Sequence, residues 1–551
     1  MFVITQSCCS DAGCVSVCPV NCIHPTPEER GFGSSDILHI DPEACIDCGA
    51  CADACPVDAI FPADKLGPRD QVFIDINADY YKNNHDVRSG WSPIGTTDDA
   101  DDRPSISYPE IPKLPAGLRI ALVGTGPAGG YALRTLLDRT EAQVTVIDRL
   151  PTAGGLVRAG VAPDHPGTKG VLRGFDLLYR DLKVTMATNV EVGDPDTPRD
   201  DRVGVVSPAE LADHFDAVFY AVGASQARRL GVPGEDLPGS TSATDLVAWY
   251  NAVPGADAAP PIRRNTADDP ASGRAVVVGT GNVALDVARI LVSPPELLAT
   301  TDIADRALAL LREQNVHEVV LLGRRDQANA AYTSAEYRAL STIPGVEVVV
   351  HDDPDPDTEL PDFSAPASAQ RRRIVFLFHS APEEIIGDGR VEGVVVTSGT
   401  RRHTIAADLA VRSIGYRSVP IAGLPFDSGR GVFPNTDGRL LADDGTVIPG
   451  AYVLGWAKRG PSGGIGANKQ CAQDTVEEFL ADAAAGKLVR STRGPEEFAA
   501  LLRSRTRQVI GYRGMRAIDR MERRRGAEQG RPRVKFTRVA DMVGAAGLRK
   551  R

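Results

Sequence analysis

Nine of the ten cysteines lie between Cys8 and Cys55, and this crowding is the first feature of the sequence that indicates chemistry. From Cys45 the chain reads CIDCGACADACP, which places four cysteines at the spacing C-x2-C-x2-C-x3-C-P. Two-residue gaps let one tight loop wrap three thiolates around a face of an iron–sulfur cubane, while the fourth cysteine characteristically serves a second cluster. Disulfides are less favoured because the N-terminal residues do not resemble a secretion signal. Zinc needs only two cysteine pairs, so it explains the pattern less well.

The cysteine block is an internal repeat with an offset of about 37 residues. The offset pairs Cys8 with Cys45, Cys14 with Cys51, and Cys18 with Cys55. It also sets Asp11 opposite Cys48, so one half of the repeat lacks its second thiolate. Two further cysteines, Cys9 and Cys22, fall opposite Ile46 and Ala59 and are not expected to be ligands.

Two clusters follow from the repeat when the fourth cysteine of each half crosses to the other half. One cluster is expected to use Cys45, Cys48, Cys51 and Cys18 as a [4Fe-4S] site. The other is expected to use Cys8, Cys14 and Cys55, and Asp11 stands at its fourth corner. A carboxylate binds iron more weakly than a thiolate does, so this second cluster is either [3Fe-4S] or a [4Fe-4S] cluster with a labile iron on Asp11. The choice of Cys8 over Cys9 rests on the offset alone.

A nucleotide-binding turn is predicted where the sequence changes to RIALVGTGPAGGYALRTLL at Arg119. Its glycines are Gly124, Gly126 and Gly129, in the pattern G-x-G-x-x-G between an apolar strand and a helix. They permit a tight turn, a close approach to a pyrophosphate, and packing of helix on strand. The next strand ends in Asp148, where a carboxylate accepts ribose hydroxyls. An ordinary strand-end aspartate is the alternative.

A second turn has the form G-x-G-x-x-A in RAVVVGTGNVALDVARILV, at Gly279, Gly281 and Ala284. Two turns of this kind predict two nucleotides. The strand that follows ends in Arg324 and Arg325 rather than in a carboxylate, and a guanidinium pair there would grip a 2′-phosphate. NADP(H) is therefore favoured over NAD(H). The alternative is that Arg324 and Arg325 are two solvated arginines on a loop.

The whole-chain properties exclude several classes of function. At 551 residues the chain exceeds what one hydrophobic core usually supports, so several domains are expected. The net charge of -12 gives no general attraction to nucleic acid. No apolar run approaches the roughly 20 residues of a membrane span, so we expect no membrane partner and a cytoplasmic protein.

Residues 1–66 resemble the seven-iron and eight-iron bacterial ferredoxins, and the resemblance implies two short hairpins and two short helices. Residues 119 to the C-terminal tail resemble the adrenodoxin reductase family of ferredoxin–NADP+ reductases. The segments that carry this second resemblance are GGLVRAGVAPDHP at 154–166, GTGNVALDVARIL at 279–291, GRRDQANAAYTSAE at 323–336, GWAKRGPSGGIG at 455–466 and RPRVKF at 531–536. Together they resemble the fused ferredoxin/ferredoxin–NADP+ reductases.

The resemblance implies an α/β fold of the glutathione-reductase type, in which an NADP domain is inserted into an FAD domain, beside a small α+β ferredoxin domain. The expected divisions are a ferredoxin domain at 1–66, a linker at 67–117, FAD segments at 118–224 and 401–493, an NADP(H) domain at 225–400 and a tail at 494–551. The run VFIDI at 72–76 in the linker is expected to add a strand.

The matched segments also imply site residues. The expected FAD contacts are Ala128, Asp148, Leu156, Val192, Trp456, Gly463, Gly464 and Ile465. The expected NADP contacts are Gly279, Thr280, Gly281, Asn282, Arg324, Arg325 and Glu336. His165 in the APDHP segment is the expected catalytic residue, which positions nicotinamide or relays a proton, and a structural role for it is the alternative.

The expected reaction follows from the combination of cofactors. NADPH delivers two electrons as a hydride whereas an iron–sulfur cluster takes one, so FAD converts between them. The family implies an external ferredoxin or another one-electron acceptor, such as a cytochrome P450 system, as partner. Three alternatives remain, namely an NADPH oxidoreductase subunit that feeds a metabolic enzyme, a redox sensor with an inactive flavin domain, and a cysteine block that only docks an external ferredoxin.

Overall fold

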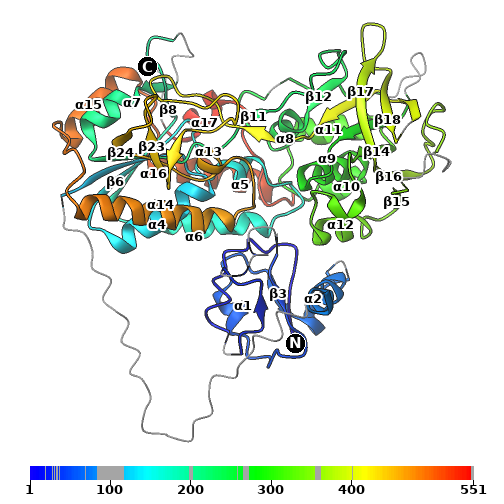
Figure 1. Cartoon of the computed structure of the whole chain (residues 1–551), viewed down its shortest axis with the longest axis horizontal. Coiled ribbons are helices and arrows are strands. Elements are labelled where there is room, and N and C mark those ends of the chain that lie inside the picture. Colours follow the sequence, from blue (N-terminus) through cyan, green and yellow to red (C-terminus); the bar gives the residue numbers. More distant parts are fainter. Residues whose placement is uncertain are drawn as a thin grey trace, which may run out of the picture. The chain divides into compact units, whose positions relative to one another are not determined.

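The computed structural model describes residues 1–18, 20–27, 29, 32, 35, 37–68, 70–83, 117–197, 203–256, 258–264, 272–353, 361–399 and 401–547 (Figure 1). The chain forms two compact units. Unit 1 comprises Met1–Val157, Gly167–Gly223 and Pro420–Tyr512, and unit 2 comprises Arg158–Pro166, Ala224–Val419 and Arg513–Arg551. Most of the expected linker at 67–117 lies outside the described residues. In the described ranges, no helix has both the length and the apolar character needed to cross a bilayer.

The first 83 residues of unit 1 form what we call the ferredoxin module. It holds two antiparallel strand pairs, β1 (Phe2–Ile4) with β4 (Ile60–Pro62) and β2 (Ile23–His24) with β3 (His39–Ile40). The first pair joins strands from the two ends of the cysteine block, so β1 and β4 do not form a local hairpin. The expectation of two short hairpins is therefore wrong for this pair. Helix α1 (Ala50–Ala54) forms in the alanine-rich second half of the repeat. The matching residues 13–17 form turns, because GCVSV is a poor helix sequence.

The expected strand at 72–76 is also wrong, because these residues begin helix α2 (Val72–Asn83). The apolar and inward residues of the longer run VFIDINADYYKN recur at helical spacing, at Phe73, Ile76, Asn77 and Tyr81. The Asn77 side chain donates to the Ile4 carbonyl at 2.8 Å, and the Tyr81 hydroxyl donates to the Cys22 carbonyl at 2.9 Å. Helix α2 therefore belongs to the ferredoxin module, which extends past residue 66.

The remainder of unit 1 is a seven-stranded sheet with helices, which we call the FAD module after the nucleotide expected there. The strand order is β22-β23-β24-β10-β5-β6-β7, and the five strands from β24 to β7 run parallel. The strands are β5 (Arg119–Val123), β6 (Gln143–Asp148), β7 (Val184–Thr188), β10 (Ala217–Tyr220), β22 (Asn435–Thr436), β23 (Arg439–Leu441) and β24 (Val447–Val453). Strands β8 (Val190–Val192) and β9 (Gly204–Val206) form a separate parallel pair.

Helices α4 (Pro127–Arg139) and α14 (Ala467–Ala484) pack along each other beside this sheet (Figure 1). The buried aromatic rings of Phe219, Tyr452 and Phe479 fill the space between β10, β24 and α14. The other helices assigned to this unit are α6 (Val171–Leu178), α7 (Pro208–His214), α13 (Trp456–Arg459) and α15 (Pro495–Arg505). Helix α5 (Gly155–Ala159) contains the point at which the chain passes from unit 1 to unit 2.

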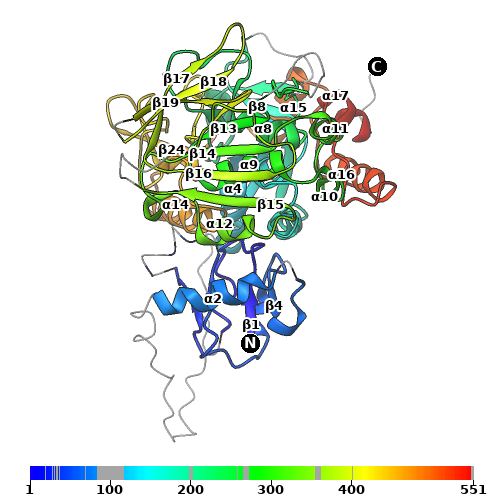
Figure 2. The ribbon, with the colours of Figure 1, turned by 90° about the vertical axis from the view of Figure 1, so that its right-hand side faces the viewer.

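Unit 2, which we call the NADP module, is built on a six-stranded parallel sheet in the order β12-β20-β13-β14-β16-β15 (Figure 2). Alternate residues of β13 and β14 face opposite sides, as a buried parallel strand requires. Val277 and Leu321 face a core of helical residues, whereas Val276 and Val320 face the antiparallel sheet β17-β18-β19. The six strands are β12 (Ser240–Ser242), β13 (Arg274–Val278), β14 (Glu318–Leu322), β15 (Val346–His351), β16 (Arg372–Leu377) and β20 (Leu409–Arg412).

The boundary expected at residue 401 has to move, because β20 pairs with β12 and β13 inside the NADP sheet. Unit 1 resumes only at Pro420. The antiparallel strands are β17 (Ser380–Ile386), β18 (Gly393–Ser398) and β19 (Arg401–Ala406), and a further pair is β11 (Gln226–Ala227) with β21 (Tyr416–Arg417). The helices of unit 2 are α8 (Ala243–Tyr250), α9 (Asn282–Val292), α10 (Pro295–Leu298), α11 (Asp305–Glu313), α12 (Ser334–Leu340), most of α16 (Tyr512–Ala527) and α17 (Val539–Ala545).

The motif RPRVKF anchors the C-terminal tail to the NADP module through buried charges. The ammonium of Lys535 lies 2.9 Å from a carboxylate oxygen of Asp302 and donates to the Asn251 side chain at 3.1 Å. Both charged side chains are buried. The guanidinium of Arg531 donates to the carbonyls of Thr301 and Ile303. A long cation inside an apolar environment is stable only with such partners.

We expect Lys535→Met to lower the free energy of unfolding by about 3 to 5 kcal/mol, because it leaves the Asp302 carboxylate buried without its cation. Chemical denaturation followed by fluorescence measures this change. The matched control is Arg538→Ala, which removes an exposed ion pair with Asp541 and should cost less than about 1 kcal/mol. Equal effects of the two substitutions would contradict the buried anchor.

Candidate functional site

The four cysteines expected to hold the first cluster line one cavity of the ferredoxin module. Cys18, Cys45, Cys48 and Cys51 surround it with Phe2, Val20, Cys22, Ile40, Ile46 and Gly49. The exposed lining of this cavity is apolar. Four thiols around an apolar hollow are a donor set that fits an iron–sulfur cluster.

Cys22 also lines this cavity, and its sulfur lies 3.4 Å from that of Cys18. The hydrogen bond between the two thiols is the main reason why the pKa of Cys18 is lowered to about 5. The same bond raises the pKa of Cys22. Cys22 therefore lies in direct contact with Cys18, the residue that the repeat predicts as the ligand.

The residues expected at the second cluster also gather in space. The thiols of Cys8 and Cys55 and the carboxylate of Asp11 all act electrostatically on the Cys14 thiol, whose pKa burial raises strongly. Burial also raises the pKa of Cys8 to about 11. Thiolates crowded in a buried space need a nearby positive charge, which the iron of a bound cluster would supply. Cys9 is buried and lies close enough to Asp11 and Cys8 for their charges to act on it, so the geometry does not separate Cys8 from Cys9.

The first nucleotide turn fits a pyrophosphate. Gly124 has φ 103°, and a Cβ there would lie 2.4 Å from the Ala221 carbonyl oxygen. A Cβ on Gly129 would lie 2.1 Å from the Gly124 carbonyl oxygen, so only glycine lets α4 approach β5 this closely. A Cβ on Gly126 would have only the Gly155 Cα within 4 Å, at 4.0 Å, which leaves room at the start of α4. Backbone N–H groups at such a helix start bind phosphate.

Asp148 lies at the end of β6, where a carboxylate can bind ribose. It accepts hydrogen bonds from the Thr125 backbone and hydroxyl and from the Leu150 backbone. These three bonds use three of roughly four acceptor positions of a carboxylate, so one remains for a ribose hydroxyl. Burial raises the pKa of Asp148, and the bonds from Thr125 oppose this effect.

Several of the other expected FAD contacts of unit 1 lie near the first nucleotide turn. A Cβ on Gly455 would lie 2.7 Å from the Ala128 Cβ, and Trp456 follows directly. The Trp456 indole donates to the carbonyls of Ser462 and Gly463, at 3.1 and 3.3 Å. Leu156 follows Gly155, whose Cβ would meet Gly126. The side chain of Val192 is buried in the apolar core of the FAD module.

The second nucleotide turn repeats this geometry in unit 2. Gly279 has φ 118°, and a Cβ there would lie 2.3 Å from the Ser413 carbonyl oxygen. A Cβ on Gly281 would meet nothing within 4 Å, so the space above the start of α9 is open. The side chain of Asn282 accepts a hydrogen bond at 3.0 Å from the Thr333 backbone, which docks the segment 323–336 over the turn.

Arg324 and Arg325 follow the end of β14 and are exposed. The residue before them, Gly323, is close to the turn, because a Cβ there would lie 3.1 Å from the Thr280 methyl group. The pair is thus at the strand end where a dinucleotide fold reads the 2′ position of the adenosine ribose.

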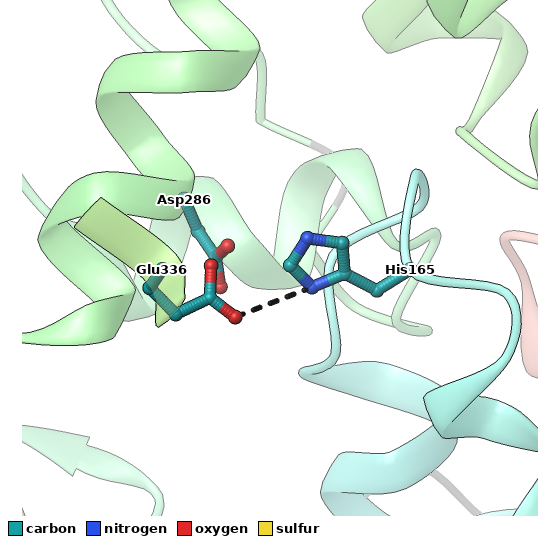
Figure 3. A group of neighbouring side chains, drawn as sticks. All are labelled: His165, Asp286 and Glu336. Carbon is teal, nitrogen blue, oxygen red and sulfur yellow. Dashed lines mark ion pairs between the residues drawn. The ribbon is translucent and has the colours of Figure 1, made fainter. Parts of the chain in front are cut away.

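His165, Asp286 and Glu336 converge in unit 2 from a loop, α9 and α12 (Figure 3). The His165 Nδ1 lies 4.0 Å from a Glu336 oxygen, which is an ion-pair distance and too long for a hydrogen bond. Burial raises the pKa of Asp286. The three side chains have the types and spacing of a metal site. The buried guanidinium of Arg289, however, already lies 2.6 Å from Asp286 and 3.5 Å from Glu336.

Sequence reasoning did not single out Arg289 as part of this group. It also binds Asp164 through two hydrogen bonds, at 2.8 and 3.1 Å, and so fixes the residue next to His165. A signal was available, since Asp286 and Arg289 are the only charged residues of the apolar helix NVALDVARILV and stand three positions apart. Such a spacing puts both on one helix face.

The fold and these sites define a flavoprotein of two dinucleotide modules that carries an iron–sulfur module. Residues 118–456 match the family model for pyridine nucleotide-disulphide oxidoreductases, and residues 38–61 match that for 4Fe-4S binding domains. Within this class, the chain belongs to the ferredoxin/ferredoxin–NADP reductase family. A relative described as a probable ferredoxin/ferredoxin–NADP reductase, from Mycobacterium tuberculosis, is 44% identical and aligns over 99% of this chain and 94% of its own length.

Relatives without the N-terminal part match the rest of the chain. The NADPH-ferredoxin reductase FprA of Mycobacterium leprae is 39% identical over 77% of this chain and 97% of its own length. The solved structure of Mycobacterium tuberculosis FprA in complex with NADPH has a TM-score of 0.67 at 37% identity, and covers 78% of this chain and 99% of that one. The expected family, fold and cofactors FAD and NADP(H) are thereby confirmed.

We expect Arg324→Ala to raise the KM for NADPH about tenfold and to leave the KM for NADH unchanged, because a charged hydrogen bond to the 2′-phosphate is lost. Steady-state kinetics with both nucleotides and ferricyanide as acceptor measures this. The control is Arg371→Ala, an exposed arginine just before β16, at the opposite end of the sheet from Arg324. A KM for NADPH that does not change in Arg324→Ala would remove the arginine from the site.

Proposed function

We propose that the chain transfers electrons from NADPH, through FAD, to the two clusters of its own ferredoxin module and from there to an external one-electron acceptor. The observation that carries the proposal is one chain that combines two open nucleotide turns with a thiol-lined cavity. The exposed pair Arg324 and Arg325 supports NADPH as the donor. When bound, FAD accepts a hydride and releases single electrons.

The protein's part in this reaction is to hold and orient the nucleotides. The starts of α4 and α9 bind the two pyrophosphates, and Asp148 holds a ribose hydroxyl of FAD. His165 positions the nicotinamide. The side chains of Glu336, Asp286 and Arg289 in turn fix the orientation of His165. Arg289 pairs with Asp286, Glu336 and Asp164, so a buried cation already stands among these carboxylates and we expect no metal ion there.

For the second cluster we propose a [3Fe-4S] form held by Cys8, Cys14 and Cys55. The ligand at the fourth corner supports this assignment, because Asp11 stands there in place of a thiolate and a carboxylate is a weaker ligand for iron than a thiolate.

Anaerobic mixing with NADPH is expected to bleach the flavin first and then to reduce the clusters, whereas NADH does so much more slowly. Stopped-flow absorbance follows the flavin, and EPR of frozen samples follows the clusters. A flavin that is reduced while the clusters stay oxidised would make the ferredoxin module a docking or sensing element. No change in either would contradict the reductase function.

Asp11→Cys is expected to convert the second cluster to a [4Fe-4S] form, because a fourth thiolate then stands at the open corner. The EPR signal of an oxidised three-iron cluster should disappear, and the iron content should rise by one atom per chain. Cys9→Ser is the control and should leave both unchanged. If Cys9→Ser loses the cluster whereas Cys8→Ser keeps it, Cys9 is the ligand.

A further inference from the structure

Two contacts join the loop around Asp11 to the start of helix α14. The ammonium of Lys469 donates a hydrogen bond to the Asp11 backbone carbonyl. Three residues earlier, the backbone of Gly466 lies against the backbone of Ser10, because a Cβ on Gly466 would lie 1.9 Å from the Ser10 carbonyl oxygen. The ferredoxin module thus rests on the FAD module through backbone that tolerates no side chain at this point.

Three more contacts join the same half of the ferredoxin module to residues 167–173. The guanidinium of Arg173 forms an ion pair with Asp58 at 2.5 Å. A Cβ on Gly170 would lie 3.3 Å from the Val57 Cα, and a Cβ on Gly167 would lie 1.9 Å from the Ser7 hydroxyl oxygen. Ser7 precedes Cys8 in the chain, and Val57 and Asp58 follow Cys55.

Tyr131 of α4 lies beneath this surface. Its ring packs edge to face on Phe175, and its hydroxyl is buried with no hydrogen-bond partner in the described part of the chain. Burial, and then the charges of Cys9 and Asp11, raise the pKa of Tyr131. These charges act on Tyr131 only because the cysteine loop lies close to α4.

The other half of the ferredoxin module is held differently. The loop before Cys48 is tied to the module's own N-terminus, by an ion pair between the Met1 amino group and Asp47 at 2.6 Å. The Gly49 backbone lies against the Phe2 ring. Cys48 is exposed, and the neighbouring Ile46 side chain is 60% exposed.

We propose that the ferredoxin module docks on the FAD module of its own chain through the side of its surface that carries Asp11 and Asp58. The side that carries Cys48 then faces external acceptors. The docking surface consists of Ser7, Ser10, Asp11, Val57 and Asp58 on one side and of Tyr131, Gly466, Lys469 and residues 167–173 on the other. It adjoins the starts of α4 and α14, near the expected FAD contacts Ala128 and residues 463–465. The proposal rests on the proposed function for its purpose, but the docking itself can be measured separately.

The test uses the holoenzyme and three charge reversals. Lys469→Glu and Arg173→Glu place a carboxylate against Asp11 and Asp58. The double variant Arg173→Glu with Asp58→Arg restores the second pair in reverse. The control Asp53→Arg makes the same charge change as Asp58→Arg at an exposed position of α1. Hydrogen–deuterium exchange of residues 7–13 and 466–472 reports docking, and stopped-flow absorbance reports flavin and cluster reduction.

In Lys469→Glu we expect the rate of amide exchange at the docking surface to rise about tenfold and the rate of cluster reduction to fall about tenfold. The reason is that a charged hydrogen bond is replaced by repulsion. Arg173→Glu, at an exposed pair, should slow it about threefold. The double variant should recover the wild-type rate, and Asp53→Arg should match wild type throughout. Flavin reduction by NADPH should be the same in all variants.

Unchanged exchange and unchanged cluster reduction in both single variants would overturn the proposed docking. Exchange that rises around Cys48 instead would show that the opposite half docks, and would overturn it as well. Clusters that stay oxidised in the wild-type protein, while Lys469→Glu still raises exchange at residues 7–13, would contradict the proposed function and leave the docking intact.

Discussion

The close approach of helix α4 to strand β5 is the constraint on which the rest of unit 1 depends. It exists because Gly129 lacks a side chain and its Cα can lie against the Gly124 carbonyl. The same approach opens the start of α4 toward a phosphate, and it lets Ala128 contact the backbone of Gly455, where the Trp456 segment begins. Helix α14 then packs along α4, so the FAD contacts and the Lys469 contact arise from neighbouring helix starts.

Electrostatics sets a second constraint in the ferredoxin module. Burial raises the pKa of Cys8, Cys14 and Cys51, so these thiols would be neutral without a positive partner. Iron is such a partner in a 4Fe-4S binding domain, whose family model residues 38–61 match. The module's small apolar core cannot replace it, because fewer than 90 residues bury little surface. Cys22 adds to this crowding, because its sulfur lies 3.4 Å from that of Cys18.

Spacing in the sequence predicted the parts of the structure that depend on local geometry. The cysteine repeat predicted that Cys18, Cys45, Cys48 and Cys51 come together, although Cys22 lines the same cavity. The two glycine patterns predicted two turns with positive φ at Gly124 and Gly279. Helix α2 was missed because VFIDI alone has strand composition, and its helical period appears only over twelve residues. The pairing of β20 with β13 was missed because it joins residues more than 130 positions apart, and no local pattern encodes it.

The segment 154–166 shows why a sequence motif can belong to two sites. At its start, Gly154 donates a hydrogen bond to the Thr125 hydroxyl in the first nucleotide turn. At its end, Asp164 is bound by the buried Arg289 of α9 in unit 2. A buried arginine with carboxylate partners is costly to separate from them. The loop that carries His165 is therefore fixed to the NADP module, although the chain before and after it belongs to unit 1. Hydride transfer needs two nucleotides, and we expect each module to hold one of them. The segment 154–166 supplies residues to both modules.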